Sequence, residues 1–207
     1  RNKTTAHHSA THLLHSALRK NLGNHVTQKG SLVSESKLRF DISHNSAISE
    51  ELIIKIEKDI NEQIFSNSSV TSSILNKSEA IKKGAMAIFG EKYGDEVRVI
   101  EMGTSNNNKA FSVELCGGTH VKRTGDIGLI KIISENSLAS GVRRLEAVAG
   151  VLAIEEYRSI EHTLNNISKS LKTNQKLVEE KILKLIVDKK EIEKEIKDIK
   201  SNKSDRV

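Results

Sequence analysis

Two histidines one helical turn apart, His8 and His12, form a motif that can bind a metal ion. They lie in "HHSATHLLH", residues 7–15, which holds four of the eight histidines of this 207-residue chain. Positions i and i+4 share one face of a helix, so both imidazoles can converge on one ion. His15 falls on the same stripe and is the nearest competing ligand, whereas His7 points elsewhere. Alone, the pair is weak evidence for a metal site, because surface or hydrogen-bonded core histidines also produce this spacing.

A second pair of metal-binding residue types lies much further along the chain, in "CGGTH". It places the single cysteine, Cys116, four positions before His120, at the end of an expected strand. Two glycines let the loop turn tightly, so thiolate and imidazole can face one ion. These ligands favour zinc over magnesium or calcium. We therefore predict one zinc per chain, bound by His8, His12, Cys116 and His120.

The number of ligands decides what such a zinc can do. Four protein ligands close the tetrahedral shell, as in structural sites, whereas a catalytic zinc keeps a position open for water or substrate. Both roles remain open from the sequence. The histidine motif contains no glutamate to act as a general base between two ligands, which disfavours a metalloprotease.

The elements that must position these residues alternate between helix and strand. Apolar spacing predicts a helix from Thr4 to about Asn21, capped by Thr4 or Thr5 and ended by Gly23. A second amphipathic helix starts at Ser49. Strands are expected at 37–43, near 69–75, and at 96–102, 110–115, 128–134 and 143–150, with a short helix near 77–85. We predict an α+β fold with a mixed or antiparallel sheet and helices on one face.

The pattern becomes helical and charged after Gly150, so we divide the chain into a body, 1–150, and a helical arm, 151–207. Apolar residues of the arm step by four and three in a heptad seam that Lys189 interrupts. The seam consists of Val178, Ile182, Leu185, Lys189, Ile192, Ile196 and Ile199. It predicts a helical hairpin or a marginal coiled coil through which the chain could self-associate.

Composition and charge limit the partners and the cellular location that we expect for this chain. The formal charge of +6 suits a polyanionic partner without requiring one. A single cysteine excludes an intrachain disulfide, and no apolar run is long enough to span a membrane. We expect a cytoplasmic protein that does not enter membranes. The chain starts at Arg1 and shows no nucleotide-binding loop, so we expect a piece of a larger protein.

Several segments together resemble the editing domain of bacterial alanyl-tRNA synthetase and the helical segment that follows it. They are "HHSATHLLHSALRKNLGNHVTQKGSLV", "LRFDISH", "CGGTHV" and "GVRRLEAVAG". The resemblance implies a threonyl/alanyl-tRNA synthetase editing-domain fold and hydrolysis of serine or glycine from mischarged tRNA(Ala). It also implies that the four zinc ligands are those named above. ATP and magnesium would serve only an aminoacylation domain absent from this chain.

The same resemblance assigns Thr11 and Gln28 to the pocket that recognises the mischarged amino acid. Alternatively, Thr11 only bonds within its helix and Gln28 is a surface residue of a loop. Some basic residues near the two half-sites could contact tRNA phosphates. They are Lys29, Lys37, Arg39, Lys122, Arg123, Arg143 and Arg144. Two other functions stay open: a free-standing trans-editing deacylase, and a non-enzymatic, zinc-stapled RNA-binding module.

Overall fold

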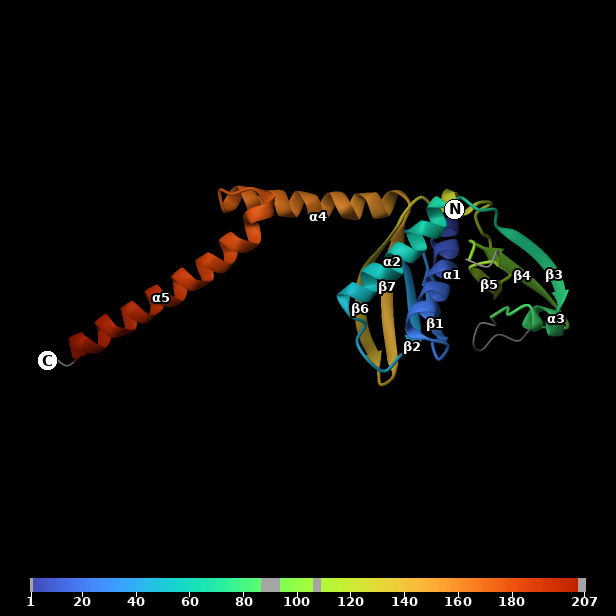
Figure 1. The fold of residues 1–207 in the computed structure, drawn as a ribbon, viewed down its shortest axis with the longest axis horizontal. Helices are drawn as coiled ribbons and strands as arrows, with labels where there is room; N and C mark the ends of the chain where they lie inside the picture. The colour runs from blue at the N-terminus through green and yellow to red at the C-terminus, as the bar shows by residue number, and fades with distance from the viewer. Residues whose placement is uncertain (1, 87–93, 106–108, 205–207) are drawn as a thin grey trace. The chain divides into compact units, whose positions relative to one another are not determined.

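The structure of the chain, a computed structural model, describes residues 2–86, 94–105 and 109–204. It divides into two compact units, Arg1–Glu155 and Glu156–Val207. The first unit contains the strands and the helices α1 to α3, and helix α4, Val151–Ser170, crosses the division (Figure 1). Among the described residues, no helix combines the length and the apolar character that a membrane span requires.

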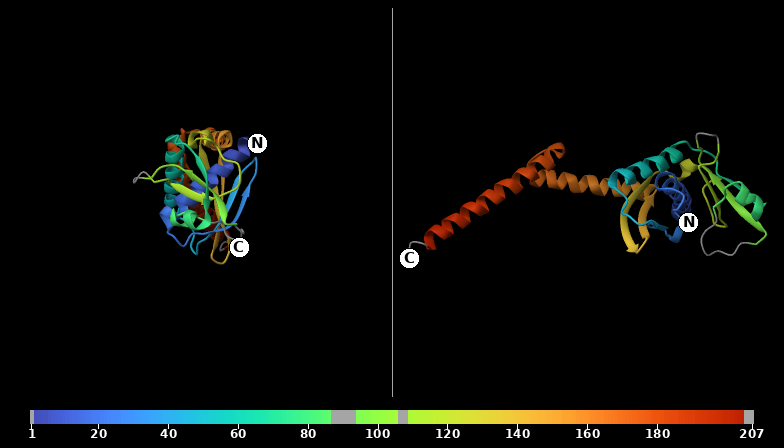
Figure 2. Two further views of the ribbon diagram at one scale, coloured as in Figure 1. Left: turned by 90° about the vertical axis from the view of Figure 1, so that its right-hand side faces the viewer. Right: turned by 60° about the horizontal axis from the view of Figure 1, so that its bottom comes forward.

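Helix α1, Asn2–Leu22, is the central element of the first unit. Its residues from Ala6 to Leu18 are buried with the exception of His8, so nearly every side of the helix is packed. Figure 1 and Figure 2 show the reason, since α1 lies between two separate sheets. It ends as the sequence predicts: Gly23 has a positive φ of 114°, and its N–H donates to the Arg19 carbonyl.

The larger sheet is antiparallel and packs against α1 and α2. Its strand order is β1-β2-β7-β6. The strands are β1 (Gln28–Val33), β2 (Leu38–Ser43), β6 (Ile130–Ala139) and β7 (Val142–Ala149). Helix α2, Glu50–Phe65, begins after Ser49, whose side chain accepts from the Leu52 N–H. The main core lies between this sheet and the two helices, and its largest fully buried side chain is Phe40.

The smaller sheet is also antiparallel, in the order β3-β4-β5. It consists of β3 (Thr71–Asn76), β4 (Glu96–Met102) and β5 (Ser112–Leu115), and the short helix α3, Lys77–Lys82, follows β3. A small core of Ala80, Val97, Val99 and Leu115 joins α3 to this sheet. Strand β5 also contacts α1, which brings the end of β5 to the histidine stripe.

The second unit consists of the remainder of α4, the 3-10 turn η2 (Gln175–Leu177) and α5 (Val178–Ser204). Lys172 has a positive φ of 49°, and the Asn174 side chain accepts from the Leu177 N–H, so the chain turns sharply between the helices. Apart from buried Val178, the apolar residues of the heptad seam are exposed in the chain. Lys189 lies 3.4 Å from Glu193 on the same helix.

The predicted α+β class with antiparallel strands and a C-terminal helix is confirmed, and three local features differ from the prediction. Within the described residues the strands form two sheets, because β3, β4 and β5 pair with one another and not with β1, β2, β6 or β7. Helix α1 is already helical at Asn2, so Thr4 and Thr5 lie within it and do not cap it. Strand β1 was not predicted, since "QKGSLV" does not alternate clearly between apolar and polar residues.

Candidate metal centre

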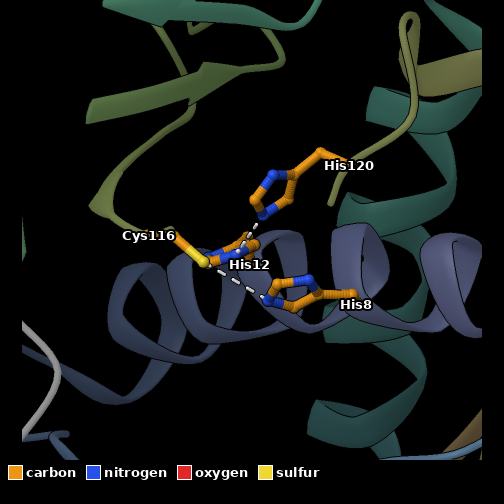
Figure 3. Close-up of side chains that lie close together, drawn as sticks. All are labelled: His8, His12, Cys116 and His120. Atoms are coloured by element: carbon orange, nitrogen blue, oxygen red, sulfur yellow. Dashed lines mark hydrogen bonds between the residues drawn. The ribbon is translucent and has the colours of Figure 1, made fainter. Parts of the chain in front are cut away.

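Three parts of the chain bring four metal-binding side chains to one point (Figure 3). His8 and His12 project from one face of α1, Cys116 directly follows β5, and His120 lies in the loop before the 3-10 turn η1, Thr124–Ile127. One ligand atom from each residue lies within 4.8 Å of the corresponding atom of every other. The two half-sites expected from the sequence therefore meet in the fold.

The Cys116–His120 loop is fixed on two sides. The Arg98 guanidinium on β4 donates to the Gly118 carbonyl at 2.6 Å. On the other side, the Val121 N–H donates to Ser9 Oγ on α1 at 3.0 Å. Gly118 lies against His8 so closely that a Cβ atom there would be 2.2 Å from the imidazole Cε1. The loop can approach α1 because position 118 carries no side chain.

The positions of the nitrogen and sulfur atoms fit a tetrahedral metal ion. His12 Nε2 and His120 Nε2 are 3.0 Å apart, and Cys116 Sγ and His8 Nε2 are 3.4 Å apart. Zinc-nitrogen bonds of about 2.05 Å at a tetrahedral angle separate two nitrogens by about 3.4 Å. The donor set of three imidazoles and one thiolate suits zinc. These four residues could therefore hold a metal ion.

The protonation states around the cluster follow from burial and neighbouring charge. Burial opposes ionisation of Cys116, but hydrogen bonds from the surrounding imidazoles outweigh it and lower the pKa of the thiol to about 3. Burial also opposes a charge on His12, but the Glu114 carboxylate raises the pKa of His12 to about 10. Burial lowers the pKa of His120. The lowered pKa of Cys116 favours the thiolate that a metal binds, whereas the raised pKa of His12 means that metal binding there displaces a proton.

Two residues next to the cluster contact each other: Glu114, which the sequence did not single out, and His15, which was expected to compete as a metal ligand. The Glu114 carboxylate lies 2.7 Å from His12 Nδ1 through Oε2 and 3.0 Å from His15 Nδ1 through Oε1. His15 is therefore not a fourth imidazole of the metal group, although it shares the stripe of α1. The two-residue period of a strand places positions 114 and 116 on the same side, and this signal was available in the sequence.

A cavity of about 490 Å³ opens beside the cluster. His8, His12 and Cys116 form part of its wall. Thr11 and Gln28, the predicted pocket residues, line the same cavity, Thr11 from α1 and Gln28 from the start of β1. The other lining residues are Ser31, Val33, Glu114, Gly117 and Gly118. A small molecule in this cavity would contact the metal ligands on one side and polar side chains on the other.

The hydroxyl of Thr11 makes the intrahelical bond expected of a threonine, since Oγ1 donates to the His7 carbonyl at 2.9 Å. That bond occupies its proton and leaves the oxygen lone pairs able to accept from a ligand in the cavity. The two interpretations of Thr11 are thus compatible. His7 itself turns away from the metal group and bonds the Ser34 carbonyl through Nδ1.

Most of the basic residues considered for phosphate contact are engaged within the chain. Lys37 pairs with Glu146, Arg143 with Glu135, and Arg144 forms a bidentate pair with Asp41. Arg39 lies 3.8 Å from the same aspartate, and Arg123 bonds Asn67. These pairs give most of the candidate residues a structural partner.

Comparison with known proteins shows which family and which proteins this chain is similar to. Residues 97–146, which include Cys116 and His120, match the family described as threonyl and alanyl tRNA synthetase second additional domain. The chain is 54% identical over 97% of its length to the Alanine--tRNA ligase of Saccharophagus degradans. It is 52% identical over 92% of its length to the Alanine--tRNA ligase of Rickettsia bellii. The resemblance to an alanyl-tRNA synthetase editing region is confirmed.

The chain covers 22% and 21% of these two relatives, so it spans about a fifth of their length. The similarity therefore concerns one region of a much longer kind of protein. The activity stated in the names of these longer relatives is assigned to this chain only as a proposal.

Proposed function

We propose that this chain is the editing region of an alanine-tRNA ligase and hydrolyses the ester of serine or glycine mischarged onto tRNA(Ala). The observation that carries the proposal is the cluster of His8, His12, Cys116 and His120 in the wall of a cavity that Thr11 and Gln28 also line. One zinc ion per chain is the metal that this donor set suits.

The need for a second pocket follows from the size of alanine. A pocket that accepts alanine cannot strongly reject glycine, which is smaller, and rejects one added hydroxyl only weakly. A separate hydrolytic pocket must therefore accept serine and glycine and spare alanine. The cavity beside the metal group, at about 490 Å³, has room for an aminoacyl group.

Selection for serine can come from hydrogen bonding. Thr11 Oγ1 has its proton on the His7 carbonyl, so it acts as an acceptor toward the serine hydroxyl. Gln28 can donate to or accept from the same hydroxyl. Alanine would leave these groups unpaired, at a cost of about 1–3 kcal/mol for buried Thr11 and less for half-buried Gln28.

Hydrolysis of an activated ester requires that the carbonyl and a water molecule be held in place. A metal bound here would supply positive charge for the ester oxygen or orient the substrate. The chain's own residues supply the cavity wall and the hydrogen bonds that orient the amino acid. Glu114 also lines the cavity, but both of its oxygens are engaged by histidines, so it is not a free general base.

The test compares deacylation of seryl-tRNA(Ala) and alanyl-tRNA(Ala) by the purified chain, with zinc measured on the same sample. We expect selective release of serine with about one zinc per chain. Cys116→Ala should lower zinc content and deacylation together. Binding of tRNA with no hydrolysis would instead support a zinc-stapled RNA-binding module.

The remaining functional assignments belong to the parent protein. Ligation of alanine to tRNA(Ala), with ATP and magnesium, would require parts of the longer relatives that this chain does not cover. A free-standing trans-editing protein is the alternative, and the gene sequence around this region distinguishes the two. The buried thiolate of Cys116 suits the reducing environment of the cytoplasm, where we place this activity.

Self-association through α5 is also a proposal. The exposed heptad seam is the surface that a second copy of the chain would cover, and Lys189 weakens it. Sedimentation of the chain over a range of concentrations measures this directly. A monomer at every concentration would contradict it.

A further inference from the structure

The carboxylate of Glu114 is buried between two histidines of α1, and only one of the two belongs to the metal group. The Glu114 side chain is 4% exposed. Its Oε2 accepts from His12 Nδ1 at 2.7 Å, and its Oε1 accepts from His15 Nδ1 at 3.0 Å. A buried carboxylate is costly unless hydrogen bonds satisfy it, so these two contacts explain how the residue is tolerated. They do not yet explain why it is there.

We propose that Glu114 is a positioning residue for the metal centre, and that His15 is the anchor that holds Glu114 in place. The proposal deepens the zinc site of the proposed function and rests on that site alone, not on the editing reaction. It assigns a role to the one histidine of the stripe that the metal group leaves out.

The first step concerns the tautomer of His12. A carboxylate only accepts hydrogen bonds, so His12 Nδ1 must carry a proton. In the neutral ring, Nε2 is then the atom with the free lone pair. Nε2 is the atom that faces His120 Nε2, 3.0 Å away, in the metal group. Glu114 therefore presents to the metal the nitrogen that can bind it, and sets the plane of the ring.

The second step concerns His15. Its ring is buried, packs 5.2 Å from the Phe40 ring, and donates to Glu114 through Nδ1. Its other nitrogen, Nε2, has no hydrogen-bond partner among the described residues. A buried nitrogen without a partner is unfavourable, so packing alone would be better served by an apolar side chain. The contact that a histidine gains here is the one with Glu114 Oε1.

The third step concerns the carboxylate itself. Apart from the two histidines, the only hydrogen bond to the Glu114 carboxylate from the part of the chain that the structure describes is a long one of 3.4 Å, from Ser112 Oγ on the same strand. Without His15, Oε1 would keep only this weak contact, and the carboxylate could rotate away from His12. Both histidines are thus needed to fix one orientation, which the helix provides by spacing them three residues apart.

The test uses this chain with zinc or cobalt(II) as the probe. Glu114→Gln keeps the shape but turns an N–H toward one histidine donor. We expect its zinc Kd to rise by about 10- to 100-fold, which is typical for the loss of a residue that orients a metal ligand. Its cobalt absorption spectrum should also differ from that of the parent chain, because His12 is no longer held in place.

The His15 variants separate anchoring from packing. His15→Asn keeps an N–H close to the position of Nδ1 and should retain affinity within about threefold, whereas His15→Phe should weaken zinc binding by at least about tenfold. Glu57→Gln is a matched control, since Glu57 is also a buried carboxylate but bonds Lys131 and the Ile132 N–H, outside the metal group. Its zinc Kd should not change.

Two results would overturn the proposal, and they are distinct. If the parent chain binds zinc and both Glu114→Gln and His15→Phe bind it equally well with an unchanged cobalt spectrum, Glu114 has no positioning role. If the parent chain binds neither zinc nor cobalt, the metal centre of the proposed function is itself wrong. Since His15→Phe keeps the carboxylate, it decides the question even if Glu114→Gln does not fold.

Discussion

Replacing Gly118 by alanine would place a methyl group in steric overlap with the edge of the His8 ring. The added Cβ would lie 2.2 Å from the imidazole Cε1 and 2.9 Å from Nδ1, where ordinary contacts start at 3.4 Å. The ring and the loop must therefore separate by about 1.2 Å, from 2.2 to 3.4 Å. Metal-ligand distances tolerate only about 0.2 Å. We expect His8 to be lost as a ligand and the zinc Kd to rise by about 100-fold or more.

Gly117 offers a matched control one residue away. A Cβ at position 117 meets no heavy atom within 4 Å, and neither Gly117 nor Gly118 has a positive φ. Gly117→Ala should therefore change the zinc Kd by no more than about twofold, as for an ordinary surface substitution. Competition with a chromophoric chelator measures both values, and circular dichroism checks the fold. Equal zinc affinity in the two variants would refute the assignment of His8 as a ligand.

Three further predictions concern the cavity, the loop and the sheet. Thr11→Val should lower serine release by about 10- to 100-fold with zinc content unchanged, because it removes one acceptor for the serine hydroxyl, while Thr11→Ser should stay active. Arg98→Gln removes the 2.6 Å bond to the Gly118 carbonyl and should speed zinc loss to a chelator. The hydrogen bond from Lys37 lowers the pKa of Glu146 below its usual 4.5, so that bond stabilises the fold above this pH and is lost as the pH falls. Glu146→Gln should cost less than about 1 kcal/mol at pH 7 and progressively less as the pH falls below 4.5, measured by denaturant titration.

Capping residues and glycines in the sequence predicted the ends of helices well where the packing of the fold agrees with these local preferences. Ser49 caps α2 as its position before an amphipathic run suggests, and Gly23 ends α1 in the left-handed region. The expected threonine cap of α1 was wrong because the helix already begins at Asn2, which places Thr4 and Thr5 inside its first turns. Strand β1 was missed because its register comes from pairing with β2 and not from its own pattern.

The candidate site could be predicted in halves but not as a whole. Helical spacing puts His8 and His12 on one face, and "CGGTH" puts Cys116 beside His120, without any knowledge of the fold. Nothing in the spacing says that the two halves meet. That meeting depends on the contact between α1 and β5, and on the close approach of Gly118 to His8. The complementary ligand types suggested that the halves share one ion, and the resemblance to a known family supported the same pairing.

Strand β5 shows why the carboxylate behind the site escaped notice. Its alternation, with Val113 and Leu115 apolar and Ser112 and Glu114 polar, suggests that the polar face points to solvent. The structure has the opposite arrangement for the polar pair, since Ser112 and Glu114 are 1% and 3% exposed. Their face is turned toward the histidines of α1, which supply the hydrogen bonds that solvent would otherwise provide. A polar face on a strand therefore indicates exposure to solvent only when no helix with polar side chains packs against that face. The histidine stripe of the first helix indicated that such a helix is present.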